Sequence, residues 1–271
     1  MSKSLSYNRH GFTLVLLSLC MMIIVFLGIT LSTVLNSNYV KKVVSSDTNV
    51  TLIKNYTNQR LGRLVNSYSV STNLSSVSLT NQDVKKIINT SVDEVYSDDS
   101  QLTIGSAILA TISSKLKLEA KRNGLNIDSE IDTVIKSNEA IMNQIVDNDL
   151  GPIEKVIVRI QTIKKLIKMV MVVAAVLFVL LAIRLRVKVG SGMLFFHHIG
   201  TVGICTSILL ALVLGCTYYP LQDLIVSNID YNVRDVLYNV LNGIFLSYIS
   251  IIFMVFIVSL LDWGSTLKYK Y

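Results

Sequence analysis

The chain has 271 residues, of which 51% are hydrophobic and 16% are charged, and its formal net charge is +7. A soluble domain carries about 25% charged residues, so this composition argues against a soluble enzyme. The apolar residues are concentrated in long runs without charge, which is typical of membrane spans.

The first apolar run covers Phe12–Leu35 and contains no charged residue. As a helix it would be about 36 Å long, enough to cross a hydrocarbon core of about 30 Å. It is longer than the apolar core of a secretory signal peptide, and no clear cleavage site follows it. We therefore expect residues 1–36 to form a cytoplasmic N-terminus and a retained first transmembrane helix.

Residues 37–168 are predicted to form a helical domain between the first and second spans. From Leu52 to Tyr68, apolar residues recur at intervals of three and four, which indicates an amphipathic helix. A polar loop over about 69–79 follows. The segment from Thr80 to Asp83 then resembles a capping box, with Asp in place of the usual Glu, and predicts the start of a second helix.

Three further helices are expected in the same region. One covers about 101–123, with Gly124 in the position of a C-cap, and the next begins near residues 128–129. A Gly-Pro pair at 151–152 interrupts the pattern, and its proline suits the first turn of a new helix. We expect that helix, Ile153–Lys168, to continue into the second span as one rod.

Residues 169–271 contain the remaining apolar runs. These are Met169–Ile183, Met193–Tyr219 and about Val236–Leu261. The third span ends in two tyrosines followed by Pro220, which predicts an interfacial anchor and then a helix stop. We therefore expect a short outer loop over 220–235 and a cytoplasmic tail after the last span.

Basic residues cluster beside the apolar runs. They are Lys3 and Arg9 before the first run, and Arg184, Arg186 and Lys188 between the second and third. Short cytoplasmic segments carry such an excess of Lys and Arg. We therefore place both termini in the cytoplasm and residues 37–168 outside it, in a multi-pass protein of the cell membrane.

Few residues in this sequence point to chemistry. His197 and His198 lie at the predicted cytoplasmic end of the third run, but adjacent side chains on a helix point about 100° apart. No HExxH motif or nearby carboxylate accompanies them, so we interpret them as interfacial polar residues, with proton or metal chemistry as the alternative. The full set of candidates for polar or interaction roles is His197, His198, Arg184, Arg186, Lys188, Arg234 and Asp235.

Several classes of function have no motif in the sequence. Phosphate-binding, dinucleotide-binding and serine-hydrolase motifs do not occur. The three cysteines lie in apolar runs without the spacing of metal ligands. We therefore expect no catalytic residue, no cofactor and no metal. The position of the basic residues favours the lipid bilayer over nucleic acid as a partner.

The order of the predicted elements resembles that of a known family. One span, an outward domain, two spans with a short inner loop, a short outer helix and a last span form the layout of the FtsX-type permease partners of ABC ATPases. The resemblance covers the topology of the whole chain and no residue motif, and it implies a transporter subunit. Those permeases carry a longer charged inner segment that couples to the ATPase, which is reduced here to Arg184–Gly192. The composition also resembles that of uncharacterised membrane proteins of low-GC Gram-positive bacteria.

Taken as a whole, the sequence predicts an all-α membrane protein with four transmembrane helices and an all-α extracytoplasmic helical bundle between the first and second. We expect a non-enzymatic protein of the bacterial envelope. Its domain over 37–168 would bind a protein partner or a second copy of the chain, or sense an envelope signal. A transporter or channel subunit is the first alternative, and a membrane-embedded enzyme that uses His197 or His198 is the second.

Overall fold

The structure is a computed structural model, and it describes most of the chain. The described residues are 11–67, 78–97, 104–122, 160–228 and 231–269, with 124, 126, 128–133, 135–137 and 139–140. Almost all of them are helical, and none of them is in a strand. They divide between two compact units. Unit 1 comprises Met1–Leu35, Lys164–Ser227 and Leu241–Tyr271, and unit 2 comprises Asn36–Ile163 and Asn228–Val240.

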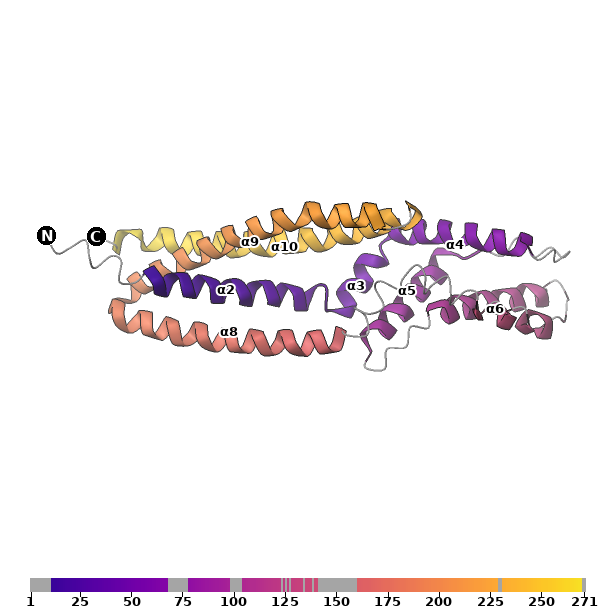
Figure 1. The fold of residues 1–271 in the computed structure, drawn as a ribbon, viewed down its shortest axis with the longest axis horizontal. Helices are drawn as coiled ribbons and strands as arrows, with labels where there is room; N and C mark the ends of the chain where they lie inside the picture. The colour runs from indigo at the N-terminus through magenta and orange to yellow at the C-terminus, as the bar shows by residue number, and fades with distance from the viewer. Residues whose placement is uncertain are drawn as a thin grey trace. The chain divides into compact units, whose positions relative to one another are not determined.

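Unit 1 is built from four long helices that run beside one another (Figure 1). They are α2 (Gly11–Ser32), α8 (Ile160–Val189), α9 (Gly192–Asn228) and α10 (Tyr231–Thr266), and a short 3₁₀ turn, η2 (Leu267–Tyr269), follows the last. Among the described residues, these four helices are long and apolar enough to cross a membrane. The prediction of four apolar spans in an all-helical chain is therefore confirmed at this level.

The ends of the third and fourth helices differ from the prediction. Pro220 lies inside α9, and α10 begins at Tyr231, so the predicted helix stop and the loop over 220–235 are wrong. Proline has a backbone φ close to that of a helix and removes a single hydrogen bond. A helix in apolar surroundings that continues past such a residue keeps its remaining backbone groups paired, whereas a loop would expose them.

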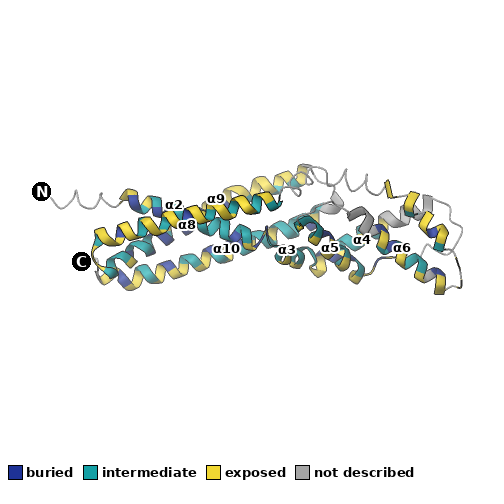
Figure 2. Ribbon diagram, turned by 90° about the horizontal axis from the view of Figure 1, so that it is seen from below, coloured by how far each residue is buried: buried dark blue, intermediate teal, exposed yellow. Residues whose placement is uncertain are grey.

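Two apolar clusters hold unit 1 together. In one, Leu17 of α2 packs with Leu185 of α8 and Val202 of α9. In the other, α2, α9 and α10 meet at Ile29, Leu210, Leu214, Tyr248 and Ile252. Large apolar side chains remain exposed along all four helices. Figure 2 colours the exposed positions of these helices yellow. Exposure of this kind is expected of helices whose solvent is lipid.

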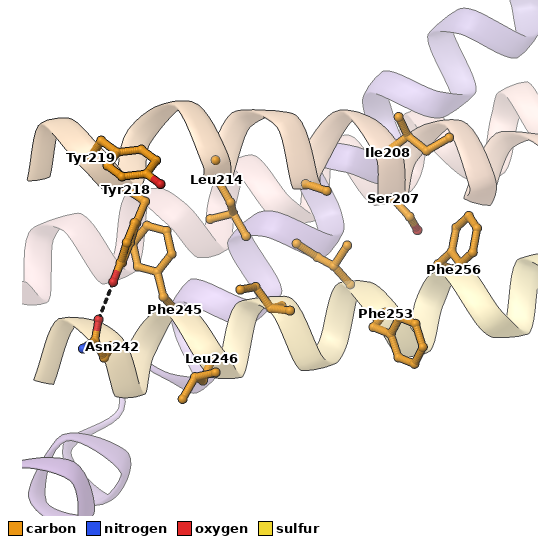
Figure 3. A pocket seen from close by; sticks show the side chains of 14 residues that line it. Ser207, Ile208, Leu214, Tyr218, Tyr219, Asn242, Phe245, Leu246, Phe253 and Phe256 are labelled. Atoms are coloured by element: carbon orange, nitrogen blue, oxygen red, sulfur yellow. Dashed lines mark hydrogen bonds between the residues drawn. The ribbon is translucent and has the colours of Figure 1, made fainter. Parts of the chain in front are cut away.

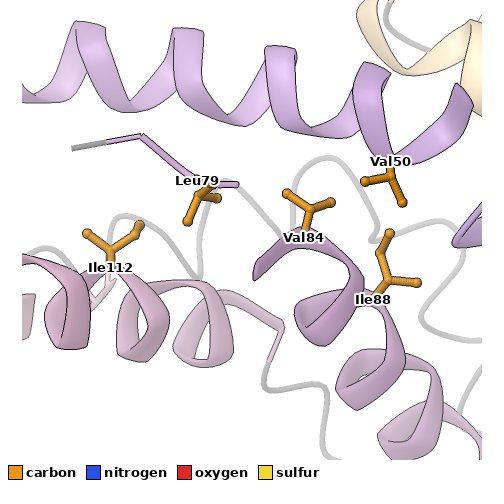
Figure 4. Close-up of a cluster of buried hydrophobic side chains, with 5 residues drawn as sticks. All are labelled: Val50, Leu79, Val84, Ile88 and Ile112. Atoms are coloured by element: carbon orange, nitrogen blue, oxygen red, sulfur yellow. The ribbon is translucent and has the colours of Figure 1, made fainter. Parts of the chain in front are cut away.

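The described residues of unit 2 include four shorter helices with a narrow core. They are α3 (Ser37–Val44), α4 (Asp47–Ser67), α5 (Asn81–Tyr96) and α6 (Ile104–Arg122). Residues 128–133, 135–137 and 139–140 are also helical. The core consists of Val50, Leu79, Val84, Ile88 and Ile112, which face one another across α4, α5 and α6 (Figure 4).

The local signals that begin and end these helices are visible in the structure. Thr80 and Asp83 form the predicted capping box at the start of α5. Gly124 has a φ of 70°, and its N–H donates to the carbonyl of Lys121 at 3.1 Å, as expected of a C-cap. The sequence interpretation missed α3, which begins after Asn36, whose side chain accepts from the N–H groups of Asn38 and Tyr39.

Some predictions fall outside the described residues. This applies to the segment 153–159 of the predicted rod before the second span, and to the polar loop over 69–77. The described part of that rod is one unbroken helix from Ile160 to Val189.

Candidate functional site

The predicted histidine pair lies where the start of α9 meets the end of α10. His197 is 4% exposed, and its ring stacks on Trp263 with centroids 5.6 Å apart. Its Nδ1 lies 3.3 Å from Thr266 Oγ1. The hydroxyl of Thr266 donates to the carbonyl of Asp262 at 2.7 Å.

His198 is half-buried, whereas His197 is buried. The two rings are 6.1 Å apart between centroids and 64° apart in plane. In the described part of the chain, no group of three His, Cys, Asp or Glu side chains is placed to hold a metal ion. The geometry around His197 is that of a polar side chain that joins two helices.

The basic candidates lie at the end of α8. Arg184, Arg186 and Lys188 are all exposed. The chain then turns through Gly190, whose φ is 71°, and α9 begins at Gly192. A Cβ at Gly192 would lie 3.6 Å from the guanidinium of Arg186, so that side chain covers the turn.

The remaining candidates, Arg234 and Asp235, belong to unit 2 through the first turns of α10. Arg234 is half-buried and Asp235 is exposed. Of the seven candidates, five therefore belong to unit 1 and these two to unit 2.

A buried amide pair in unit 2 was missed by the sequence interpretation. Asn49 of α4 is 1% exposed, donates to the carbonyl of Val43 at 3.0 Å, and accepts from Asn239 Nδ2 at 3.0 Å. Asn49 precedes Ile53 and Tyr56 by four and seven residues, so it lies on the apolar stripe of its helix. A polar residue on such a stripe is the signal that could have identified it.

Ion pairs and hydrogen bonds join the other helices of unit 2. Lys41 of α3 pairs with Asp93, and Lys115 of α6 pairs with Asp83. Partial burial raises the pKa of Asp83, but hydrogen bonds from Lys115 and Thr80, with the charge of Lys115, outweigh this effect and leave the pKa below its usual value. Burial raises the pKa of Tyr96 to about 12.

An apolar groove lies between α9 and α10 within unit 1 (Figure 3). Its volume is about 760 Å³, and Tyr218 Oη donates to Asn242 Oδ1 at 2.7 Å at one end. The sequence interpretation assigned these residues to spans and identified no groove, because a groove depends on the separation of two helices that are distant in sequence.

No protein-family model, curated protein or solved structure matches this chain.

Proposed function

We propose that this chain is a non-enzymatic integral membrane protein of the bacterial envelope. The four long helices cross the membrane, both termini are cytoplasmic, and unit 2 is extracytoplasmic. Unit 2 binds a protein partner or senses an envelope signal, and the crossing helices relay that event. The polar contacts around His197 and Asn49 support a structural role for these side chains, because both join helices to each other.

The observation that carries this proposal is that three helices contribute residues to both units. Helix α10 gives Tyr231–Val240 to unit 2 and its remaining residues to unit 1, α8 gives Ile160–Ile163 to unit 2, and the last residue of α9, Asn228, also belongs to unit 2. In unit 2, Asn239 donates to Asn49, and the side chain of Gln161 donates to the carbonyl of Tyr96. A partner that changes the packing of unit 2 therefore acts on residues of the same helices that cross the membrane.

The orientation is tested by the accessibility of single cysteines. The three native cysteines are replaced by serine, and one cysteine is introduced at Asn55 in unit 2 or at Ser265 near the end of α10, both of which are exposed. We expect a membrane-impermeant maleimide to label Asn55→Cys in intact cells and to label Ser265→Cys only after the membrane is permeabilised. The opposite pattern would overturn the proposed orientation.

The role of unit 2 is tested by cross-linking in the native membrane, with the full chain tagged and purified in mild detergent. A partner captured from cross-linkers in exposed positions of unit 2, such as Asn55 and Gln59, and not from equivalent positions in α8, such as Val176, would support the proposal. A chain that captures no partner and tolerates disruption of the unit 2 core without a phenotype would contradict it.

A transporter subunit of the FtsX type is the second candidate. The order of the elements favours it, whereas the short connection between α8 and α9 does not, since α8 ends at Val189 and α9 begins at Gly192. Capture of an ATPase through Arg184, Arg186 or Lys188 in the same cross-linking experiment would support this second candidate over the first.

A further inference from the structure

The groove between α9 and α10 has the shape of a ligand site. Its floor includes the buried side chains Leu214 and Ile252, and its rims include exposed ones such as Ile249 and Phe253. A volume of about 760 Å³ falls within the range of about 300–1,000 Å³ that is usual for small-molecule pockets. On α9, Ala211 and Gly215 line the groove, and a Cβ at Gly215 would have no atom within 4 Å.

The groove extends along only part of the two helices. From Ser207 to Tyr219 on α9 it is about 18 Å long, slightly more than the roughly 15 Å of hydrocarbon in one leaflet of a bilayer. Beyond its Ser207 end, α9 and α10 touch, because a Cβ at Gly200 would lie 2.8 Å from the backbone nitrogen of Trp263. A transmembrane helix from another chain would need a contact surface that extends through both leaflets. One lipid acyl chain needs a groove only as long as a single leaflet is deep.

The polarity of the groove is graded from one end to the other. Tyr218 and Asn242 are at one end, and Ser207 and Phe256 are at the other (Figure 3). Because Tyr218 donates to the amide oxygen of Asn242, the amide nitrogen of that residue can donate to an acceptor on a ligand. The Ser207 hydroxyl donates to the carbonyl of Gly203, so it adds no donor to the apolar end.

We propose that this groove binds one acyl chain of a membrane glycerolipid, with the ester region at Tyr218 and Asn242 and the methyl end near Phe256. An ester supplies a carbonyl that can accept a hydrogen bond from the Asn242 amide. Among the described residues, no charged side chain lines the groove, so binding selects the acyl chain and its ester and not the charge of the head group. This inference rests on the proposed function only in requiring that α9 and α10 cross a bilayer.

The test uses the full chain reconstituted into phosphatidylcholine vesicles that contain a phosphatidylcholine with a diazirine at the end of one acyl chain. After irradiation, mass spectrometry locates the label. We expect label on the peptides around Ile208 and Phe256 and not around Tyr219, and the same pattern in phosphatidylglycerol vesicles.

Two variants and a matched control sharpen the test. Gly215→Leu and Ala211→Phe fill the groove, and Gly28→Leu places the same side chain on α2, where a Cβ also has open space. We expect labelling at the groove to fall about tenfold in the first two, which corresponds to the loss of about two buried methylenes, and to stay unchanged in the third. Thermal unfolding of each variant confirms that it folds.

Each other outcome overturns the inference. Label that is equal along all four helices, or unchanged in Gly215→Leu, would show that the groove does not hold a lipid chain. If the label is absent and Gly215→Leu disrupts an oligomer, the groove is an interface between subunits. Flotation of the vesicles separates the two proposals: a chain that does not float contradicts both, and a chain that floats with even labelling contradicts this inference alone.

Discussion

Unit 1 and unit 2 are both helical, but different interactions hold their helices together. In unit 1, long helices pack through apolar clusters and small residues, and many of their large apolar side chains remain exposed. In unit 2, amphipathic helices bury a small core and place ion pairs such as Lys117–Asp132 on the surface. The first pattern suits a lipid solvent and the second suits water.

The polar contacts differ between the units in the same way. In unit 1, the hydroxyls of Tyr248 and Thr30 share a hydrogen bond of 2.6 Å, and Thr206 donates to the carbonyl of Ser18 at 3.1 Å, so hydroxyl groups join neighbouring helices. In unit 2, amide side chains make such contacts. The side chain of Asn58 accepts a hydrogen bond from the N–H of Leu79 and donates one to the carbonyl of the same residue. Helix packing therefore depends on steric fit in unit 1 and on a few buried contacts in unit 2.

The largest loss of stability is expected from a substitution in the core of unit 2, because this core consists of few buried residues. Leu79 is 3% exposed and Leu118 is 53% exposed, so Leu79→Ala and Leu118→Ala are the same substitution in opposite environments. We expect Leu79→Ala to lower the free energy of unfolding of unit 2 by about 2–5 kcal/mol, and Leu118→Ala by less than about 0.5 kcal/mol. Hydrogen exchange of the α5 amides measures both. Equal effects would show that unit 2 lacks the narrow core described above.

In unit 1 the sharpest test is steric. A Cβ at Gly200 would lie 2.8 Å from the backbone nitrogen of Trp263 and 2.9 Å from the carbonyl oxygen of Ser259. Because backbone atoms cannot move aside as a side chain can, we expect Gly200→Ala to destabilise the packing of α9 on α10 by about 1–3 kcal/mol. Gly28→Ala, which meets no atom within 4 Å, is the control. Thermal unfolding in detergent that leaves both variants equal would contradict close packing at this point.

The features that the sequence predicted are those that depend on neighbouring residues. The four long helices follow from charge-free runs, and the capping box at Thr80 follows from residues three apart. Pro220 misled the interpretation, because a single missing hydrogen bond does not end a helix whose surroundings favour its continuation. The sequence interpretation also missed α3, although Val40, Val43 and Val44 are spaced three and four residues apart along this short helix.

The features that the sequence did not predict depend on distances between elements. Asn49 and Asn239 are separated by 190 residues, and the local sequence around either residue does not indicate a contact with the other. The groove is another case, because Tyr218 and Asn242 were assigned to different spans. The contact of His197 with Trp263 is a third case, because it depends on the packing of α9 on α10.

The amide pair tests whether α10 is held in unit 2 by a specific contact. Asn239→Ala would leave the buried Asn49 oxygen without its donor, and we expect a loss of about 1–2 kcal/mol in the stability of unit 2. Asn55→Ala, at an exposed position of α4, is the control. A double-mutant cycle with Asn49→Ala isolates the pair. A coupling energy near zero would mean that the first turns of α10 are held by their apolar side chains alone.

The smallest expected effect is the response of unit 2 to acid, which unit 1 should not share. The folded-state pKa of Asp83 is below its usual value of 3.8, so its ion pair with Lys115 stabilises unit 2 fully above that value. This stability is lost as the pH falls through the folded-state pKa. Because the pair is partly exposed to solvent, we expect a loss of at most about 1 kcal/mol.

Asp83→Asn should remove this pH dependence, and Lys115→Met should raise the pKa of Asp83 toward its usual value. Hydrogen exchange of the α5 amides between pH 7 and pH 3, corrected for intrinsic exchange rates, measures both effects. If wild-type protein and Asp83→Asn lose stability in parallel over this range, the acid response belongs to other carboxylates. The pairs of Asp93 with Lys41 and of Asp132 with Lys117 would then be the groups to change next.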